Sequence, residues 1–388
     1  MRYAIWGSEL SPYTLKLRAL LAAAALPYRD LPAQGTRGEN LRAQWQLARG
    51  KRRRTIERWP HLDPLDEYPL VPFLFEGETR ILFDSSAIAA WLDRFHGSRR
   101  GPLLPDDPAL GFVVRLIDEA FDELGLYLVH HARWVVSATT NDAGQRVARE
   151  FARVLPPGAQ GVFARHFARR QVRRLPYLFS VAPAGSAIAG LPADLTPPAR
   201  AGFPPTHALL EQIWHAALDA VEALLRQQPF LLGERFTLAD ASVYGQLGMN
   251  LKDPSAAEVM RRRAPTTFRW LCGVRDGAHM RATGSLALGN RLRPLLELLD
   301  RTFVPLMAQN AAAYERARAA GETRFNEAAF DRERALYDGT LLGQPFRSVA
   351  KTFQVRVWQD LRAAWAALDA PARARVRQVM PTDRALEG

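Results

Sequence analysis

The hydrophobic pattern of the chain changes once, near residue 100, and this change limits the folds that it can adopt. Before that point, short stretches with strand-like alternation are interspersed with stretches at helical spacing, in the order β-α-β-(segment 33–68)-β-β-α. After residue 108, apolar residues recur mainly at helical spacing. A chain of 388 residues can form two or three domains with their own cores. We therefore predict an α/β half followed by a larger all-helical half.

The first half, residues 1–96, forms one predicted domain. Its predicted strands and helices are the strands 2–7, 28–31, 71–75 and 79–83 and the helices 12–25 and 84–95. Residues 33–68 form a polar, Arg-rich insertion to which the pattern assigns no definite element. Residues 97–108 are rich in Gly, Pro and Asp, which is typical of a linker between domains.

The second half divides into a helical domain, residues 108–274, and a helical C-terminal extension, residues 285–388. The helical domain carries an insertion at 138–205 that is rich in Gly and Pro and contains a short basic helix at 160–174. The other predicted helices of this domain are 109–136, 207–226, 237–250 and 254–274. The extension is predicted to contain helices at 291–320 and 348–368.

The single cysteine and the lack of long apolar runs restrict the class of protein. Cys272 alone excludes an internal disulfide framework and a CxxC redox pair, and its apolar neighbours favour a buried, inert thiol over a reactive one. The longest apolar run, residues 19–26, is too short to cross a membrane. Nothing resembles a signal peptide, so we expect a cytoplasmic protein without a membrane partner.

The charge of the chain is strongly positive, with a net value of +12. Almost all basic residues are arginines, and together with the many alanines this bias is typical of a GC-rich coding sequence. Dense clusters lie at Lys51–Arg54 and Arg165–Arg174. Solvated faces, or attraction of small acidic molecules, explain these clusters better than a polyanion or protein partner does, so nucleic acid is not an expected partner.

Ser11 and Pro12 stand between the first predicted strand and the first predicted helix. Serine is a preferred N-cap and proline is favoured at the first helical position, so capping alone explains the pair. The same geometry also suits thiol chemistry, because a helix N-terminus favours a thiolate and a serine hydroxyl can donate to its sulfur. Lowering a thiol pKa by two units takes roughly 2.7 kcal/mol, which one charge-assisted hydrogen bond and a helix terminus could supply.

Two further pairs have a structural and a chemical interpretation. Pro72 in Val71-Pro72 suits the first residue of a strand, and Asp84-Ser85 can cap the helix that follows it. Chemically, Asp84 could bind the ammonium of an α-amino acid head group, with Ser85 and helix N–H groups binding its carboxylate.

Together these three motifs resemble those of the glutathione transferases of the serine type, in which the tau and zeta classes and many bacterial relatives look alike. The segment Pro229–Asp240 (PFLLGERFTLAD) resembles the C-domain signature of that family, with Thr237 and Asp240 spaced as in a capping box. The resemblance implies a thioredoxin-like N-terminal domain and a helical C-terminal domain. It covers residues 1–96 and parts of 108–274, but not the extension.

The resemblance also implies roles for individual residues. Ser11 would activate the thiol, and glutathione would be the co-substrate. Val71 would contact the cysteinyl unit through its backbone, beside a cis Pro72, and Asp84 and Ser85 would hold the γ-glutamyl end. Thr237 and Asp240 would be structural.

The predicted function is conjugation of the glutathione thiolate to a small apolar electrophile, and the resemblance allows a homodimer. The alternative is a non-catalytic interaction or binding module on the same fold. His130 and His131 are adjacent on a helix and face different ways, so no metal site is expected. Tyr127, His131 and Trp134 share the helix that lines the electrophile pocket in that family, although core packing is the better explanation of each of them.

Overall fold

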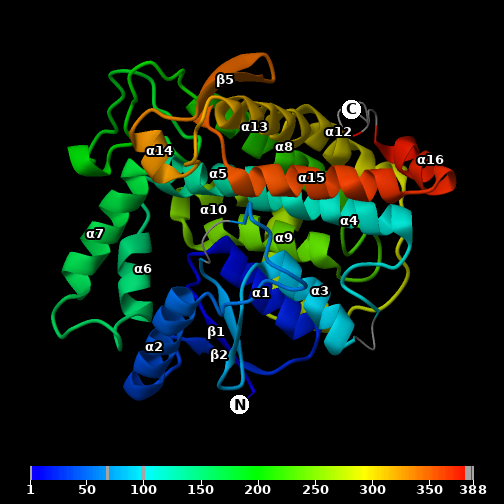
Figure 1. Cartoon of the computed structure of the whole chain (residues 1–388), viewed down its shortest axis with the longest axis horizontal. Coiled ribbons are helices and arrows are strands. Elements are labelled where there is room, and N and C mark those ends of the chain that lie inside the picture. The colour runs from blue at the N-terminus through cyan, green and yellow to red at the C-terminus, as the bar shows by residue number, and fades with distance from the viewer. Residues whose placement is uncertain (1, 67–69, 98–100, 381–385, 387–388) are drawn as a thin grey trace.

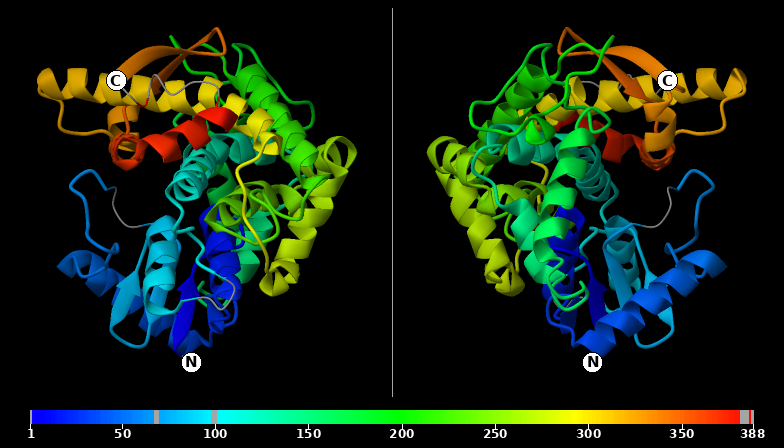
Figure 2. Two further views of the ribbon diagram at one scale, coloured as in Figure 1. Left: turned by 90° about the vertical axis from the view of Figure 1, so that its right-hand side faces the viewer. Right: turned by 90° about the vertical axis from the view of Figure 1, so that its left-hand side faces the viewer.

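The computed structural model describes residues 2–66, 70–97, 101–380 and 386. A four-stranded sheet with flanking helices forms the N-terminal half, and helices form most of the remainder (Figures 1 and 2). This architecture confirms the predicted fold class, a thioredoxin-like α/β half followed by a larger helical half. Among the described helices, none is both long and apolar enough to cross a bilayer.

The N-terminal half contains, in chain order, β1 (Tyr3–Trp6), α1 (Pro12–Ala23), β2 (Tyr28–Leu31), α2 (Arg37–Arg53), β3 (Phe73–Glu76), β4 (Arg80–Leu82) and α3 (Ser85–Phe95). The strand order is β2-β1-β3-β4, with β1 parallel to β2 and antiparallel to β3. Alternate residues of β1 face opposite sides of the sheet. Ile5 belongs to the core that contains residues of α1 and α3, whereas Trp6 packs with residues of α2.

Helix α2 lies inside the segment 33–68, where the sequence pattern assigned no element. A capping box begins the helix, since Thr36 Oγ1 accepts from the N–H of Glu39 and the Glu39 carboxylate accepts from the N–H of Thr36. Ala43 and Leu47, four residues apart, are buried against the sheet. Much of the predicted insertion is therefore an integral helix of the α/β half.

The helical domain is built around one long helix, formed by α4 (Pro108–Ala120), η1 (Phe121–Gly125), α5 (Leu126–His131) and η2 (Ala132–Val136), in which η1 and η2 are π-helical turns. The remaining helices are α6 (Ala143–Glu150), α7 (Gln160–Arg173), η3 (Ala193–Leu195), α8 (His207–Leu225), α9 (Leu238–Gly248), η4 (Met249–Lys252), α10 (Pro254–Arg263), α11 (Pro265–Arg275) and η5 (Ala278–Arg281). The prediction of one helix over 254–274 was wrong. Ala264 is not helical, because the following Pro265 disfavours the α conformation at the residue before it.

The C-terminal extension contains η6 (Asn290–Leu292), α12 (Arg293–Arg301), α13 (Phe303–Ala319), α14 (Glu327–Asp331), β5 (Leu336–Leu341), β6 (Gln344–Val349), α15 (Thr352–Ala367) and α16 (Ala370–Val379). The strands β5 and β6 form an antiparallel hairpin, which corrects the prediction of an all-helical extension. Leu342 and Gly343, between the strands, both have positive φ, as a tight two-residue hairpin turn requires. Figure 1 shows that α15 then returns along α4, so the extension reaches the centre of the molecule.

A buried ion cluster joins the two halves where α1 packs against α9 and the long helix. Lys16 of α1 has no solvent exposure, and its Nζ lies 2.5 Å from Asp118 Oδ1, 2.6 Å from Asp122 Oδ2 and 2.7 Å from Ser86 Oγ. Burial would lower the pKa of Lys16, but the two carboxylates outweigh it and raise the pKa. Gly245 of α9 permits this close packing, since a Cβ there would lie 2.7 Å from the carbonyl oxygen of Pro12.

The variant Lys16→Met tests how much this cluster contributes to the free energy of unfolding. We expect a loss of about 3–5 kcal/mol in the free energy of unfolding, because two buried carboxylates would lose their cation. Urea unfolding measures the loss. Lys252→Met is the matched control, since Lys252 pairs with Glu9 at the surface and such pairs contribute about 0–1 kcal/mol. Equal losses in the two variants would contradict the role assigned to Lys16.

Candidate functional site

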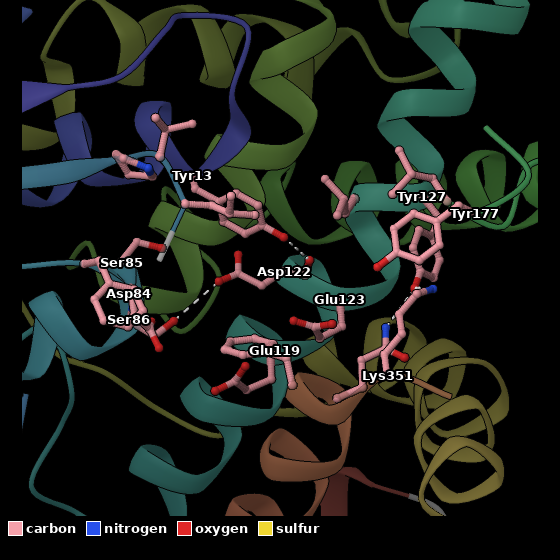
Figure 3. Close-up of a pocket in the computed structure, with 18 of the residues that line it drawn as sticks. Tyr13, Asp84, Ser85, Ser86, Glu119, Asp122, Glu123, Tyr127, Tyr177 and Lys351 are labelled. Atoms are coloured by element: carbon pink, nitrogen blue, oxygen red, sulfur yellow. Dashed lines mark hydrogen bonds between the residues drawn. The ribbon is translucent and has the colours of Figure 1, made fainter. Parts of the chain in front are cut away.

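A pocket of about 220 Å³ lies between the α/β half, the long helix and the start of α15 (Figure 3). Most of its walls come from the segment before β3, the N-terminal ends of α1 and α3, and one face of α4, η1 and α5. The lining residues are Tyr13, Leu70, Val71, Pro72, Phe83, Asp84, Ser85, Ser86, Glu119, Asp122, Glu123, Leu126, Tyr127, Arg174, Tyr177, Leu178, Lys351, Phe353 and Gln354.

Four of the five predicted site residues line this one pocket: Val71, Pro72, Asp84 and Ser85. The peptide bond between Val71 and Pro72 is cis, as the resemblance implies. The fold thus brings together, from both ends of the β3–β4 hairpin, residues that the sequence singled out separately. Their roles toward a ligand stay predictions.

Ser11, the fifth predicted residue, is the N-cap of α1 and does not belong to the described lining of the pocket. Its Oγ accepts a hydrogen bond of 3.4 Å from the N–H of Thr14, which leaves its own hydroxyl proton available for donation. Tyr13 lines the pocket instead, and its hydroxyl donates to the carbonyl oxygen of Asp122 at 2.8 Å.

The Asp84 carboxylate is already neutralised within the protein. It caps α3 by accepting from the N–H groups of Ser86 and Ala87, and Asp84 itself has a positive φ of 68°. Arg58 Nε lies 2.7 Å from Asp84 Oδ2 and Arg356 Nη2 lies 3.7 Å from it. Burial would raise the pKa of Asp84, but the two guanidinium groups outweigh it and hold the pKa below its usual value.

A row of carboxylates from the long helix forms the inner wall of the pocket. Glu119, Asp122 and Glu123 lie three and four residues apart, so they share one helix face at the start of the π-helical turn η1. Burial raises the pKa of Asp122 to about 7, against the opposing charge of Lys16. Burial and the neighbouring charge of Asp118 raise the pKa of Glu119 well above its usual value.

The C-terminal extension closes the pocket on the side opposite the sheet. Lys351 Nζ and Gln354 Nε2 donate to the hydroxyl of Tyr127 at 2.6 and 2.8 Å. Farther along α15, Arg356 Nε lies 2.7 Å from Asp66 Oδ1 in a nearly solvent-free ion pair. These contacts attach α15 to both halves of the molecule, and no local pattern in the sequence indicates them.

The remaining predicted residues are mostly structural. Thr237 and Asp240 form the predicted capping box of α9, and Asp240 also accepts from the N–H of Leu231. Of the three residues on the long helix, Tyr127 lines the pocket, whereas His131 and Trp134 are buried in the core.

Cys272 does not belong to the described lining of the pocket. Cys272 is half-buried, more exposed than the buried thiol that we expected. In the described part of the chain, no group of three or more His, Cys, Asp or Glu side chains could hold a metal ion.

The two arginine clusters lie mainly on the surface, at the end of α2 and along α7. Arg174, at the end of the second cluster, is an exception. It lines the pocket, and its Nε donates to Glu327 of α14 at 2.8 Å.

Comparison with known proteins points to the family that the motifs indicated. Residues 197–249 match the family model described as "Glutathione S-transferase, C-terminal domain". This match covers α8, the capping box and α9, the elements that pack against the long helix and α1. The chain is similar to the glutathione S-transferases. No curated protein matches the sequence.

Several solved structures align with most of the chain at low identity. The β-etherase LigF from Sphingobium sp. strain SYK-6 is 15% identical over 72% of this chain and 99% of its own, with a TM-score of 0.42. A glutathione S-transferase from Methylobacterium radiotolerans in complex with glutathione sulfonate is 19% identical over 74% and 98%, with a TM-score of 0.39. One from Rhodospirillum rubrum is 18% identical over 76% and 91%, with a TM-score of 0.36.

The variant Glu119→Gln tests the raised pKa of the Glu119 carboxyl in the inner wall. A carboxyl whose pKa is higher in the folded than in the unfolded state stabilises the fold most below its unfolded pKa, and this contribution is lost as the pH rises through the folded pKa. From the ordinary glutamate pKa of 4.5 up to pH 8, the wild type should therefore lose more unfolding free energy than Glu119→Gln, by about 1.4 kcal/mol for each pKa unit of the shift. Urea unfolding across this range measures it. The exposed Glu315→Gln should follow the wild type, and parallel profiles for all three would refute the shift.

Proposed function

We propose that this protein is a glutathione transferase-like enzyme that binds glutathione in the interdomain pocket and transfers its thiolate to an electrophile. The observation that carries the proposal is the convergence of the cis Val71-Pro72 bond, Asp84 and Ser85 on one pocket at the N-terminus of α3. The family match at residues 197–249 supports it, because that segment packs directly behind the pocket.

The proposed chemistry would use groups that line the pocket, together with Ser11 at the N-cap of α1. The backbone of Val71 would pair with the cysteinyl unit, and the start of α3 with Ser85 would bind the γ-glutamyl carboxylate, which a helix N-terminus favours. The Ser11 hydroxyl would donate to the sulfur and favour its thiolate, whose proton passes to water. The thiolate then forms a carbon–sulfur bond with the electrophile, and the leaving group departs with its bonding electrons. Holding both reactants in one pocket adds proximity to this activation.

The alternative, a non-catalytic binding module on the same fold, also has specific support. Asp84 is already paired with Arg58 and lies near Arg356, so the ammonium of glutathione would have to compete for it. Ser11 serves as a helix cap outside the described pocket lining. A cytoplasmic location and a homodimer stay predictions of the sequence.

Glutathione binding and conjugation distinguish the two. We expect the protein to bind glutathione in isothermal titration calorimetry and to conjugate it to 1-chloro-2,4-dinitrobenzene. Ser11→Ala should lower kcat about 10- to 100-fold with little change in glutathione affinity, since hydrogen bonds to charged groups contribute about 1.5–3 kcal/mol. Thr36→Ala removes another helix N-cap, one that does not belong to the described lining of the pocket, and should leave kcat unchanged. Absence of conjugation, with or without glutathione binding, would refute the enzyme and favour the non-catalytic module.

The variant Arg356→Gln tests whether α15 competes with the ligand. Removing Arg356 takes one of two cations away from Asp84, so glutathione affinity should rise about three- to tenfold in the same titration. Arg375→Gln on α16, which removes an exposed pair with Asp107, is the control and should leave affinity unchanged. Near-ultraviolet circular dichroism confirms that each variant is folded. A fall in affinity for folded Arg356→Gln would show that Arg356 binds the ligand instead.

A further inference from the structure

A second cavity, of about 430 Å³, lies against α1, and its described lining residues do not overlap with those of the pocket in Figure 3. Leu15, Arg18, Ala19 and Ala22 line it, and because this spacing is helical, one face of α1 forms a wall. Tyr28 at the start of β2, the end of α9 and the segment from the end of α11 to η5 also line it. The proposed transferase chemistry uses none of these residues.

Tyr244 of α9 directs an unused hydroxyl into this cavity. The residue is only 5% exposed, and its hydroxyl has no hydrogen-bond partner among the described residues, yet the oxygen is not fully enclosed by protein atoms. The nearby groups whose charges act on this hydroxyl are Arg18, Arg275, Tyr28 and Asp276, and all four line the cavity. Burial raises the pKa of Tyr244 to about 12, so the hydroxyl keeps its proton at neutral pH and can donate it.

Tyr28 and Arg18 add further donors at the same place. The Tyr28 hydroxyl also lacks a hydrogen-bond partner among the described residues, and burial raises its pKa to about 12. Arg18 Nε donates to Asp30 Oδ1 at 2.9 Å, but no described residue accepts from its two Nη nitrogens. The side chain of Arg18 is 22% exposed, so a ligand in the cavity can reach these nitrogens. Two phenol groups and one guanidinium therefore have donors to offer.

The carboxylates that line the cavity are already paired with cations of its own wall. Asp276 accepts through both oxygens from Nε and Nη2 of Arg275, at 2.8 and 3.0 Å. Glu9 Oε2 lies 2.6 Å from Lys252 Nζ. The spare hydrogen-bonding capacity of the described lining is therefore mainly that of donors. Charged oxygens, which only accept hydrogen bonds, are the groups that complement such a set.

The rest of the lining is largely apolar, so the ligand is more than a bare inorganic ion. The volume of the cavity falls within the range of about 300–1,000 Å³ that is usual for small-molecule sites, which combine apolar walls with a few polar groups. One of these apolar side chains, Met280, is 38% exposed in the structure. The apolar residues beside the donors include Leu15, Ala22, Leu251, Val274 and Met280.

We propose that this cavity binds a small organic anion, an apolar body with one carboxylate or phosphate group, whose oxygens accept from the hydroxyls of Tyr244 and Tyr28 and from Arg18. The planar fork of an arginine matches either anionic group, and the negative charge strengthens each hydrogen bond. A neutral ligand of the same size lacks this gain. The site goes beyond the proposed transferase function and does not depend on it.

Four probes test the proposal in the absence of glutathione: benzoate, phenyl phosphate, inorganic phosphate and benzyl alcohol. Titration calorimetry uses the full-length protein at pH 7.5 in 0.15 M NaCl, which screens the basic surface beyond about 8 Å. We expect one or both organic anions to bind at least tenfold more tightly than benzyl alcohol and inorganic phosphate. The tighter of the two identifies the anionic group that the cavity prefers. Because glutathione is absent, failure of the transferase proposal would leave this result intact.

Variants locate the binding groups. Tyr244→Phe, which removes one oxygen and no charge, should weaken the organic anion at least tenfold and leave benzyl alcohol unaffected. Tyr28→Phe should weaken the anion at least threefold. Tyr314→Phe is the matched control, since Tyr314 of α13 is also nearly buried but belongs to the described lining of neither cavity.

Near-ultraviolet circular dichroism establishes that each variant is folded. Equal affinity of the wild type for the organic anions and benzyl alcohol would overturn the proposal, as would no binding of any probe. Anion affinity that is unchanged in folded Tyr244→Phe would also overturn it, because the anion would then bind elsewhere on the basic protein.

Discussion

The arrangement of the two halves depends on the ion cluster around the fully buried Lys16. Its ammonium reaches from α1 to Asp118 and Asp122 of the long helix and to Ser86 at the start of α3. Removing Lys16 would leave two buried carboxylates without their cation, which costs far more than the loss of an exposed pair. The same contact fixes the rotamer of Asp122, because Lys16 and Ser86 both hold one of its carboxylate oxygens. A structural ion cluster thereby sets the polarity of the candidate site.

The C-terminal extension completes the site that the first two domains outline. The thioredoxin-like half supplies the cis Val71-Pro72 segment and the start of α3, and the long helix supplies the carboxylates. The hairpin β5–β6 and the helix α13 support the segment before α15, where Asn310 holds the backbone of Lys351 through its side-chain amide. Lys351, Gln354 and Arg356 then reach Tyr127 and Asp66. The extension is thus part of the pocket wall and not an appendage.

Local signals in the sequence were sufficient for the scaffold and for four pocket residues. The strand–helix order and the Thr237–Asp240 capping box were predictable, because each depends on residues close together in the chain. The cis bond before Pro72 was implied by the resemblance to the glutathione transferases. The capping box of α2, Thr36 to Glu39, is an equally local signal for the start of a helix. The helix was not predicted, because the residues around this signal are mostly polar and show no clear apolar face. The hairpin β5–β6 was harder, since its turn depends on Leu342 adopting a positive φ that leucine seldom adopts.

The chemistry of the pocket was not predictable, because it arises from contacts between distant segments. Tyr127 and Lys351 are separated by 224 positions, and Arg356 meets Asp66 only because the extension folds back along α4. Glu119 and Asp122 read as ordinary polar positions of an amphipathic helix. Their significance appears only when burial by α1, α3 and α15 raises the pKa of both carboxyl groups.

The charge of the whole chain and the charge of the site act at different ranges. A net charge of +12 attracts anions to the surface, which suits the approach of an anionic tripeptide. Surface charges are screened beyond about 10 Å at ordinary ionic strength, so this attraction does not decide what binds inside. There the carboxylates of the long helix act at short range in a poorly solvated space and favour a cation.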